Sequence, residues 1–407
     1  MPEADSAARV SKCIYRRVLV ASFVLGIFMP LLDWRFDLDP GVELTENRTL
    51  ASAPAWPKTD AEWKALPNAL QSYWNDAFGF RRRLLHWHAV AKLRLGISPT
   101  PAVVIGQHLL FFAGDGAFEQ HRGHMPFPAA ELSNWGTQLE ARRTWLASKG
   151  AHFLFVIAPD KQSIYPEDVP ARYGPFGHSP ADQLVEYLRG KTQVDVLDLR
   201  TTLRAARADG PVFPATDTHW NDKGAVAAYV AIVERLRVWY PSMAPRSPAS
   251  FKRYPMRRWN GDLGLMLPGL FELVAETGEQ WQPVPAPAAQ ELANDGYHPP
   301  ETSRFSEYAM ASRPDLPRAV VFHDSYLLAP DERSFGQPLP TGALAPPVPK
   351  YRPRPLLAEQ FSHSAFSWQY QFDPSFVEHE HPDVVIEEYV ERQLRHGPQD
   401  TAVPAPP

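Results

Sequence analysis

Four runs of largely apolar residues constrain the fold of this chain more than any other feature of its sequence. They lie at residues 152–158, 194–199, 318–324 and 383–388. Short apolar runs of this kind are typical of strands that are buried on both faces of a sheet. Segments with helical patterns alternate with them, at residues 132–148, 179–188 and 225–239. The alternation predicts an α/β fold, a three-layer sandwich in which helices cover both faces of a central, mostly parallel sheet.

The composition narrows the class of protein further. The chain has 407 residues, of which 44% are hydrophobic and 21% are charged, so it can bury a large core. The formal net charge of -5 does not indicate the excess of basic residues that is typical of proteins that bind nucleic acid. The single cysteine, Cys13, permits neither a disulfide within the chain nor a cysteine-based metal site. A cysteine-free remainder suits an oxidising compartment.

The amino terminus has the pattern of an export signal or a membrane anchor. Lys12, Arg16 and Arg17 precede an uncharged apolar run at residues 18–32, which ends at Asp33. No small-residue cleavage site precedes Asp33, which favours an uncleaved anchor over a removed signal peptide. A buried helix of a soluble domain is the alternative, but such a helix would show a polar face. With the basic residues inside, the remainder of the chain is predicted to face the periplasm.

A region rich in aromatic and basic residues follows the apolar run. Residues 43–56 have the pattern of an extended segment, and residues 61–95 have helical spacing. The apolar positions of the helical part are predicted to form a core rather than a ligand site: Trp63, Leu66, Leu70, Tyr73, Trp74, Phe78, Leu84, Leu85 and Trp87. Residues 81–83 are three arginines that suit a solvated face, and contact with anionic sugar or phosphate at a membrane surface is the alternative.

Three polar residues have the chemistry of a nucleophilic site. Asp217 and His219 stand two residues apart in a loop before a helix, and Ser325 follows the apolar run at 318–324. In extended chain, residues two apart point the same way, so the Asp217 carboxylate can bond the His219 imidazole. The imidazole could then take the proton of Ser325, which lies at the carboxyl end of a strand, where open α/β sheets place their chemistry. We hypothesise a catalytic triad; a local capping pair is the alternative for Asp217 and His219.

Several short motifs, taken in order, resemble a known family. They are Asn47-Arg48-Thr49-Leu50, Phe78-Gly79-Phe80-Arg81, Pro159-Asp160-Lys161, Ile164-Tyr165-Pro166, Asp217-Thr218-His219-Trp220, Gly261-Asp262-Leu263, Asp324-Ser325 and Pro382-Asp383-Val384-Val385. Over residues 46–394 the chain resembles the SGNH-hydrolase-like acetyltransferases of bacterial exopolysaccharide biosynthesis, the alginate O-acetyltransferase J and X proteins. The resemblance implies an SGNH-hydrolase-like fold with a circularly permuted order of motifs, and it maps the family's triad onto Asp217, His219 and Ser325. His323 departs from the generic pattern, which has glycine before the Asp-Ser pair.

Five further residues are candidates for binding substrate. They are Lys161, Tyr165, Trp220, Asp262 and Trp368. Lys161 follows a strand and could hold a substrate carboxylate, or it could pair with Asp160 or another acid. Asp262 is predicted to cap a short helix, and the resemblance offers a place near the site as the alternative. Trp368 lies in an aromatic segment, 366–370, whose spacing suits core packing or, alternatively, stacking on sugars.

The chain is predicted to fold in five parts. They are a cytoplasmic tail (1–12), a signal anchor or transmembrane segment (13–33), an extended and helical region (34–100), the SGNH-hydrolase-like acetyltransferase domain (101–394) and a disordered Pro/Ala tail (395–407). Residues 273–306 are predicted to add a hairpin layer. The proline-rich residues 330–355 are predicted to form an inserted loop near the site, either a lid or a surface decoration. Lys350, Arg352 and Arg354 of this loop could meet an anionic polymer.

The activity that the resemblance implies is O-acetyl transfer in the periplasm, at the inner membrane. An acetyl-Ser325 intermediate would acetylate hydroxyl groups of an alginate-like exopolysaccharide. A multi-pass membrane O-acyltransferase is implied as the partner that relays the acetyl group from acetyl-CoA. The sequence has no Gly-rich phosphate loop, so no bound cofactor and no metal are predicted. Two alternatives remain, a polysaccharide acetyl-esterase with the same triad and a non-catalytic polysaccharide-binding protein of the same fold.

Overall fold

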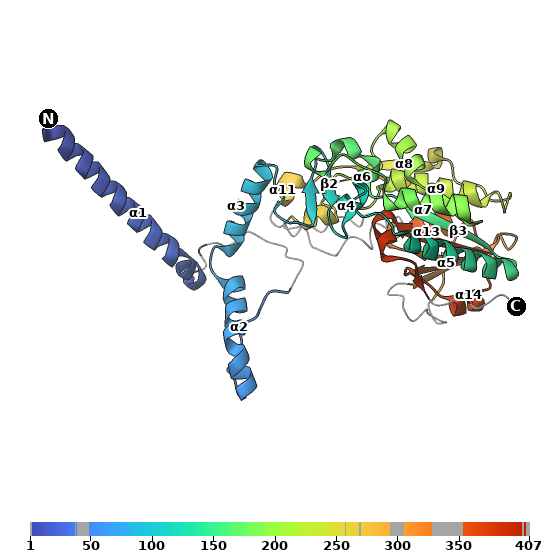
Figure 1. The fold of residues 1–407 in the computed structure, drawn as a ribbon, viewed down its shortest axis with the longest axis horizontal. Coiled ribbons are helices and arrows are strands. Elements are labelled where there is room, and N and C mark those ends of the chain that lie inside the picture. Colours follow the sequence, from blue (N-terminus) through green and yellow to red (C-terminus); the bar gives the residue numbers. More distant parts are fainter. Residues whose placement is uncertain are drawn as a thin grey trace. The chain divides into compact units, whose positions relative to one another are not determined.

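The computed structural model describes residues 2–36, 38, 49–256, 258–267, 270–293, 305–327, 353–400 and 403. The chain divides into two compact units, one of residues 1–100 and 265–273 and the other of residues 101–264 and 274–407. The first unit contains the long helices α1 (Pro2–Phe36), α2 (Asp60–Ala77) and α3 (Arg81–Arg94), and the second contains the sheet with its covering helices (Figure 1). Most of the predicted inserted loop at 330–355 lies outside the described residues.

A seven-stranded sheet forms the centre of the second unit, in the order β4-β3-β12-β9-β10-β8-β7. Five neighbouring strands run parallel: β4 (Asp195–Asp198), β3 (His152–Ala158), β12 (Val384–Val390), β9 (Arg318–His323) and β10 (His363–Trp368). Two further strands extend the sheet in antiparallel fashion, β8 (Phe305–Ala309) and β7 (Gln290–Glu291). The sheet is therefore mostly parallel, as the apolar runs predict.

Alternate residues of the strands face opposite sides of the sheet, which produces two apolar layers. Val156 and Val321 lie in one layer, and Phe155 and Val320 lie in the other. The first layer is covered by α8 (Arg200–Ala206), α9 (Asp222–Leu236) and α13 (Pro353–Ala358). The second is covered by α5 (Ala129–Ser148), α7 (Pro180–Lys191) and α14 (Pro374–Glu380). The predicted three-layer α/β fold is confirmed.

Local sequence signals set the starts of two helices beside the sheet. Ser179 caps α7 by accepting the backbone N–H of Asp182, and proline follows the cap. Asn221 caps α9 by accepting the backbone N–H of Gly224 across 3.0 Å. Both helices therefore begin directly after a capping side chain. The second cap fixes the chain two residues after His219, one of the candidate site residues.

Shorter elements complete the description of the chain. They are β1 (Val103–Ile105), β2 (Leu110–Phe112), α4 (Ala117–His121), α6 (Lys161–Ile164), β5 (Phe251–Pro255), α10 (Asp262–Leu265), α11 (Phe271–Val274), β6 (Glu279–Pro283), β11 (Gln371–Phe372) and β13 (Gln399–Asp400). β1 and β2 pair in antiparallel fashion on either side of a short turn that contains Gly106. Single turns of 3-10 helix connect several of these elements.

The later part of the chain differs from prediction in three places. Tyr389 and Val390 extend β12 beyond the predicted run at 383–388, because they pair with Ile157 and Ala158 of β3. Gln399–Asp400, within the tail predicted to be disordered, form β13 beside β11. In the described part of 273–306, β6 pairs with the earlier strand β5, and β7 pairs with β8 of the main sheet, so these strands do not form a separate hairpin layer.

The described part of the first unit is mainly three helices, α1 (Pro2–Phe36), α2 (Asp60–Ala77) and α3 (Arg81–Arg94). Within α1, the stretch Tyr15–Phe36 is long and apolar enough to cross a membrane. The apolar stripe of α2 and α3 does not form the predicted core. Its exposed members are Trp63, Leu70, Trp74, Leu84 and Trp87, and α2 has no buried side chain. The prediction is wrong because helical spacing shows only that side chains share one face of a helix. It does not show whether protein covers that face.

Candidate active site

Asp217, His219 and Ser325 converge beyond the carboxyl end of β9. Ser325 follows this strand by two residues, and Asp217 and His219 precede α9. The Oγ atom of Ser325 lies 2.8 Å from Nε2 of His219, and Oδ1 of Asp217 lies 2.8 Å from Nδ1 of the same ring. The two contacts join a hydroxyl, an imidazole and a carboxylate in the order that nucleophilic catalysis requires. The predicted grouping is present in space, and the catalytic roles stay predictions.

The Asp217 carboxylate holds both the ring and the backbone of His219. Its Oδ1 atom accepts the backbone N–H of His219 across 2.8 Å, in addition to the contact with the ring. An aspartate that accepts an N–H two residues later closes a tight local turn. The carboxylate favours the tautomer with hydrogen on Nδ1, which leaves Nε2 to accept the proton of Ser325. Asp217 and His219 are both buried, which limits competition from water for these bonds.

Lys161 supports the loop that leads to Asp217. Its ammonium group donates to the backbone carbonyl oxygens of Leu110 (2.9 Å), Pro214 (2.8 Å) and Ala215 (3.4 Å). The residue is 2% exposed, and burial lowers the pKa of Lys161 to about 8. Pairing of Lys161 with Asp160, one of the alternatives, does not form, because Asp160 pairs with Arg392 instead. A buried ammonium bonded to backbone carbonyls is better placed to position the loop than to bind substrate.

Glu276 holds the same loop from a distant part of the chain. Its carboxylate accepts the backbone N–H groups of Ala215 (2.7 Å) and Thr216 (2.6 Å), and also the hydroxyl of Thr216. The Thr216 hydroxyl oxygen in turn accepts the backbone N–H of Gly261 across 2.8 Å. A Cβ atom at Gly261 would collide with Asp217, so glycine permits this close approach. Sequence reasoning missed Glu276, because no motif marks a single acid sixty residues from its partners.

Asp262 lies beside the triad, in the position that the resemblance offered as the alternative. Its carboxylate accepts the backbone N–H (2.7 Å) and the hydroxyl (2.5 Å) of Thr218, the residue between Asp217 and His219. Its Oδ2 atom is 3.8 Å from Nδ1 of His219. Asp262 also begins α10, so the predicted helix start is present too. Burial, and then the negative charge of Asp217, raise the pKa of Asp262.

Asp324 organises the segment that carries the candidate nucleophile. Its Oδ1 atom accepts the backbone N–H of Tyr326 (2.8 Å), and its Oδ2 atom accepts the Tyr370 hydroxyl and the Val390 N–H (2.8 Å each). Its own N–H donates to Glu388 across 3.0 Å. Burial, and then the charge of Asp324, raise the pKa of Glu388 well above its ordinary value. The end of β12 and the chain after β10 therefore fix this segment together.

Tyr326 connects the two halves of the site. Its hydroxyl donates to the backbone carbonyl oxygen of Thr218 across 3.0 Å. The Trp220 ring packs edge-on against the Tyr326 ring, with centroids 4.9 Å apart and an interplanar angle of 89°. Trp220 is 2% exposed, so it supports the site from within the core and offers little surface to a substrate. Tyr326 has no sequence signal of its own beyond its place after Ser325.

The last two candidate substrate-binding residues lie apart from these contacts. The Tyr165 hydroxyl accepts the backbone N–H of Val212 across 2.9 Å, and the Arg207 guanidinium lies 4.5 Å from the Tyr165 ring centroid. Trp368 is half-buried at the end of β10, in register with His323 of β9. Tyr165 therefore braces the loop that approaches Asp217. The contact of Trp368 with substrate stays a prediction.

Three groups of described residues could in principle hold a metal ion. They are Asp217, His219 and Asp262; His121, Asp160 and Glu391; and Glu307, His363 and Glu380. In the first group, the imidazole nitrogen nearest the carboxylates is already hydrogen-bonded to Asp217. In the second, the negative charge is balanced by arginines at 200 and 392. A cation in the first group would have to break the contact that orients the imidazole, and one in the second would meet two guanidinium groups.

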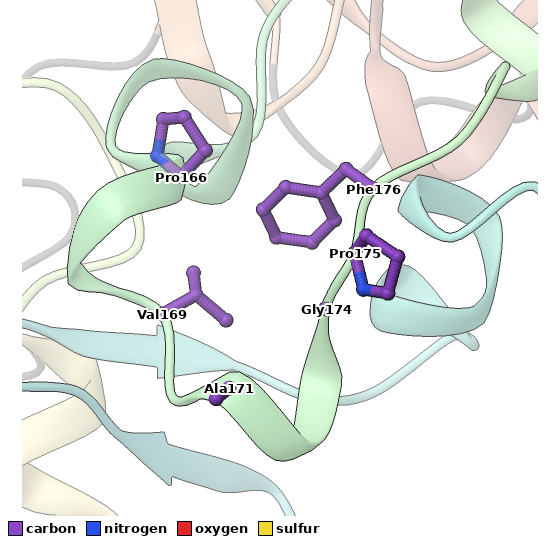
Figure 2. Close-up of a pocket in the computed structure, with 6 residues that line it drawn as sticks. All are labelled: Pro166, Val169, Ala171, Gly174, Pro175 and Phe176. Atoms are coloured by element: carbon purple, nitrogen blue, oxygen red, sulfur yellow. The ribbon is translucent and has the colours of Figure 1, made fainter.

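A hollow of about 330 Å³ lies on the segment between α6 and α7. Figure 2 shows that Pro166, Val169, Pro175 and Phe176 line it mainly with carbon atoms. Ala171 and Gly174 complete its lining, and no member of the triad contributes to it. The hollow therefore supplies no titratable group for acyl transfer.

Comparisons with known proteins agree with the motifs. Residues 103–299 match a family model described as an SGNH hydrolase-like domain, acetyltransferase AlgX. A probable alginate O-acetylase AlgJ of Pseudomonas syringae is 24% identical over 212 residues, which cover 52% of this chain and 50% of the relative. The AlgJ protein of Pseudomonas aeruginosa, named in the same way, is 24% identical over 275 residues, 66% of this chain and 64% of the relative. The matches thus span half to two thirds of these relatives, and the predicted resemblance is confirmed.

The solved structure of PatB1 supports the fold. PatB1 of Bacillus cereus has a TM-score of 0.50 at 13% identity, covering 72% of this chain and 96% of that protein. The O-acetyltransferase domain of Pseudomonas putida AlgJ has a TM-score of 0.43 at 20% identity, covering 72% of this chain and 92% of the domain. At 13% sequence identity, the match to PatB1 shows a similar fold and gives no information about function.

Proposed function

We propose that this chain, which has an SGNH-hydrolase-like fold and is similar to the alginate O-acetyltransferase J and X proteins, is an O-acetyltransferase with an acetyl-serine intermediate. The observation that carries the proposal is the pair of 2.8 Å contacts that join Ser325 to His219 and His219 to Asp217. These contacts supply a nucleophile, a base and an orienting carboxylate. The names of the curated relatives support acetyl transfer as the reaction.

The reaction would proceed in two halves at Ser325. In the first, Oγ attacks the acetyl carbon of the donor while Nε2 of His219 takes the hydroxyl proton. The leaving group then receives that proton as its bond to the acetyl carbon breaks, which leaves acetyl-Ser325. In the second, an acceptor hydroxyl attacks the acetyl group, gives its proton to His219, and Ser325 recovers that proton on release. Preorganised donors would stabilise each oxyanion, and the backbone N–H of Ser325 is the predicted first donor.

The proposed acceptor is a hydroxyl group of an alginate-like exopolysaccharide. The relatives named as alginate O-acetylases support this class of acceptor. The proposed donor is an acetyl group relayed from acetyl-CoA by a multi-pass membrane O-acyltransferase, with no cofactor bound to this chain. Both the acceptor and the partner come from the resemblance and need their own tests.

The proposed location is the inner membrane, with the second unit in the periplasm. The stretch Tyr15–Phe36 can span a bilayer by its length and composition, and Arg16 and Arg17 at its start suit the cytoplasmic side. An uncleaved anchor is supported by the Asp33 side chain, which accepts the backbone N–H of Phe80 across 2.7 Å. Removal of the segment as a signal peptide would remove this contact within the first unit.

An assay with 4-nitrophenyl acetate as donor and an oligouronate as acceptor tests the proposal. Wild-type protein should release 4-nitrophenol, yield acetylated oligosaccharide, and show acetylation of the peptide that contains Ser325 after rapid quenching. Ser325→Ala should lose all three signals, whereas Ser148→Ala, a change of an exposed serine on α5, should keep them. Free acetate without acetylated acceptor would identify an esterase. Unchanged acetylation of the polymer in cells that carry Ser325→Ala would identify a non-catalytic binding protein.

A further inference from the structure

Large apolar side chains are exposed along one face of α2. Trp63 and Trp74 are each 50% exposed, and Leu70 is 48% exposed. Positions 63, 70 and 74 follow the i, i+7, i+11 spacing that places side chains on the same side of a helix. Such an apolar face on a folded unit marks a surface that contacts something else.

The exposed apolar surface continues on α3. Leu84 is 46% exposed and Trp87 is 59% exposed. Positions 84 and 87 are three apart and are neighbours on the helix surface. We call Trp63, Leu70, Trp74, Leu84 and Trp87 the aromatic face. Three of its five members are tryptophan, the residue that membrane proteins concentrate at the boundary between hydrocarbon and water.

Residues 78–80 form the turn between α2 and α3, which we call the elbow. The elbow contacts the end of the apolar stretch of α1. The backbone N–H of Phe80 donates to the Asp33 carboxylate across 2.7 Å. Phe80 adopts a left-handed conformation with φ of 59°, which turns the chain from α2 into α3. At Gly79, an added Cβ would collide with the Pro30 carbonyl oxygen and with Asp33, so the backbone lies directly against the helix end.

This attachment sets the depth of the elbow relative to a bilayer. Asp33 lies near the carboxyl end of the candidate span Tyr15–Phe36. A charged carboxylate at the end of a span belongs at the level of the lipid headgroups, outside the hydrocarbon. The elbow bonded to that carboxylate must then lie at the same level, and α2 and α3 extend from it.

The charge of α3 selects among possible partners. Its sequence from Arg81 to Arg94 contains four arginines, one lysine and no acidic residue. An apolar face rich in tryptophan, together with a basic helix, suits an interface that contains anionic lipid. A soluble protein partner would not explain why the surface begins at the end of a candidate membrane span.

We propose that the aromatic face lies in the headgroup region of the bilayer that α1 crosses, so that α2 and α3 are interfacial helices. The inference rests on the proposed membrane anchor and adds a second attachment beyond it. The occupant of the surface is lipid, with anionic headgroups near the exposed Arg82. This assignment gives a role to the apolar stripe that the sequence predicts as core.

Site-directed spin labelling of the full chain tests the proposal. The single cysteine is replaced by Cys13→Ser, and a nitroxide is attached at Trp63→Cys, Trp74→Cys or Trp87→Cys in proteoliposomes of phosphatidylethanolamine and phosphatidylglycerol. Ser72→Cys is the matched control, because it is exposed on α2 nine residues after Trp63 and faces the opposite side. Lys191→Cys, exposed in the other unit, is the reference for water. Collisions with oxygen and with a water-soluble nickel chelate are measured by power saturation.

The expected result is several-fold lower collision with the nickel chelate at 63, 74 and 87 than at 72 and 191, with oxygen collision raised. Chelate collision at the aromatic face equal to that at 191 would overturn the proposal, since the face would then be in water. Low collision with both reagents would also overturn it, because the face would be covered by protein. A label at Leu25→Cys separates this result from the proposed anchor. If Leu25→Cys lies in hydrocarbon while the aromatic face is in water, only the present inference fails.

Discussion

The hydroxyl of Tyr326 donates a hydrogen bond to the backbone carbonyl oxygen of Thr218 across 3.0 Å. Tyr326 directly follows Ser325, and Thr218 lies between Asp217 and His219. The bond joins two segments that are 108 residues apart in the chain. It therefore helps to set the distance between the candidate nucleophile and its candidate base.

Tyr326→Phe should impair chemistry more than substrate binding. The change keeps the ring that packs against Trp220 but leaves the Thr218 carbonyl without its donor, so the free energy of unfolding should fall by about 1 to 3 kcal/mol. The value of kcat should fall about tenfold or more, with KM little changed, because the distance from His219 to Ser325 is no longer held. Tyr240→Phe is the matched control, since its hydroxyl donates to the Asp383 carbonyl through a 2.7 Å bond outside the site. An equal loss of kcat in both variants would contradict the prediction.

Asp217→Asn should leave the protein folded and nearly inactive. An amide at this position can no longer hold the imidazole in the tautomer that leaves Nε2 free, so kcat should fall by about 10³ to 10⁴. Steady-state kinetics with the activated ester and circular dichroism check activity and fold separately. Asp315→Asn, which removes an exposed carboxylate paired with Arg313, should leave kcat unchanged. Near wild-type activity in Asp217→Asn would remove this residue from the mechanism.

Asp262→Asn should change how stability depends on pH. Burial and the charge of Asp217 raise the pKa of Asp262 above its ordinary 3.8, so the folded protein binds this proton more tightly than the unfolded chain. The stabilising contribution is complete below the unfolded pKa and is lost as pH rises through the folded pKa. Asparagine does not titrate, so the variant should gain stability relative to wild type as pH rises above about 4. Chemical denaturation at several pH values measures the difference, and a constant difference would refute the assignment.

Lys161→Met should destabilise the loop before Asp217. Methionine retains most of the apolar stem but leaves carbonyl oxygens of Leu110 and Pro214 without their donor, at a cost of about 2 to 4 kcal/mol. The value of kcat should fall as well, because the loop positions Asp217. Lys191→Met, at an exposed lysine on α7, should change neither quantity.

Lys161 also has a pH signature. Burial lowers its pKa from 10.5 to about 8, so between these values the unfolded chain binds more protons than the folded protein. Stability from this residue should therefore rise with pH across that interval, and Lys161→Met should remove the rise. Thermal unfolding of both proteins at a series of alkaline pH values provides the measurement. An identical pH dependence in wild type and variant would contradict the assignment.

Contacts between distant segments were beyond prediction from the sequence. Glu276 reaches the loop at 215–216 from about sixty residues away, and no local pattern reports such a meeting. The Asp324 carboxylate likewise accepts hydrogen bonds from Tyr326, Tyr370 and Val390, two of which are distant in the chain. Continuation of β12 through Val390 also depends on its neighbour β3 rather than on its own residues.

The sequence by itself determined four of the parallel strands of the sheet, the caps at Ser179 and Asn221, and the residue types of the candidate triad. These features are local, because apolar periodicity, capping side chains and a motif two residues apart are complete within a few positions of the chain. The tertiary structure alone decided that Lys161 and Trp220 are buried and that the aromatic face of α2 and α3 is exposed. Burial depends on what the rest of the fold places over a residue. An apolar stripe on a helix has the same sequence pattern whether a protein core or a membrane covers it.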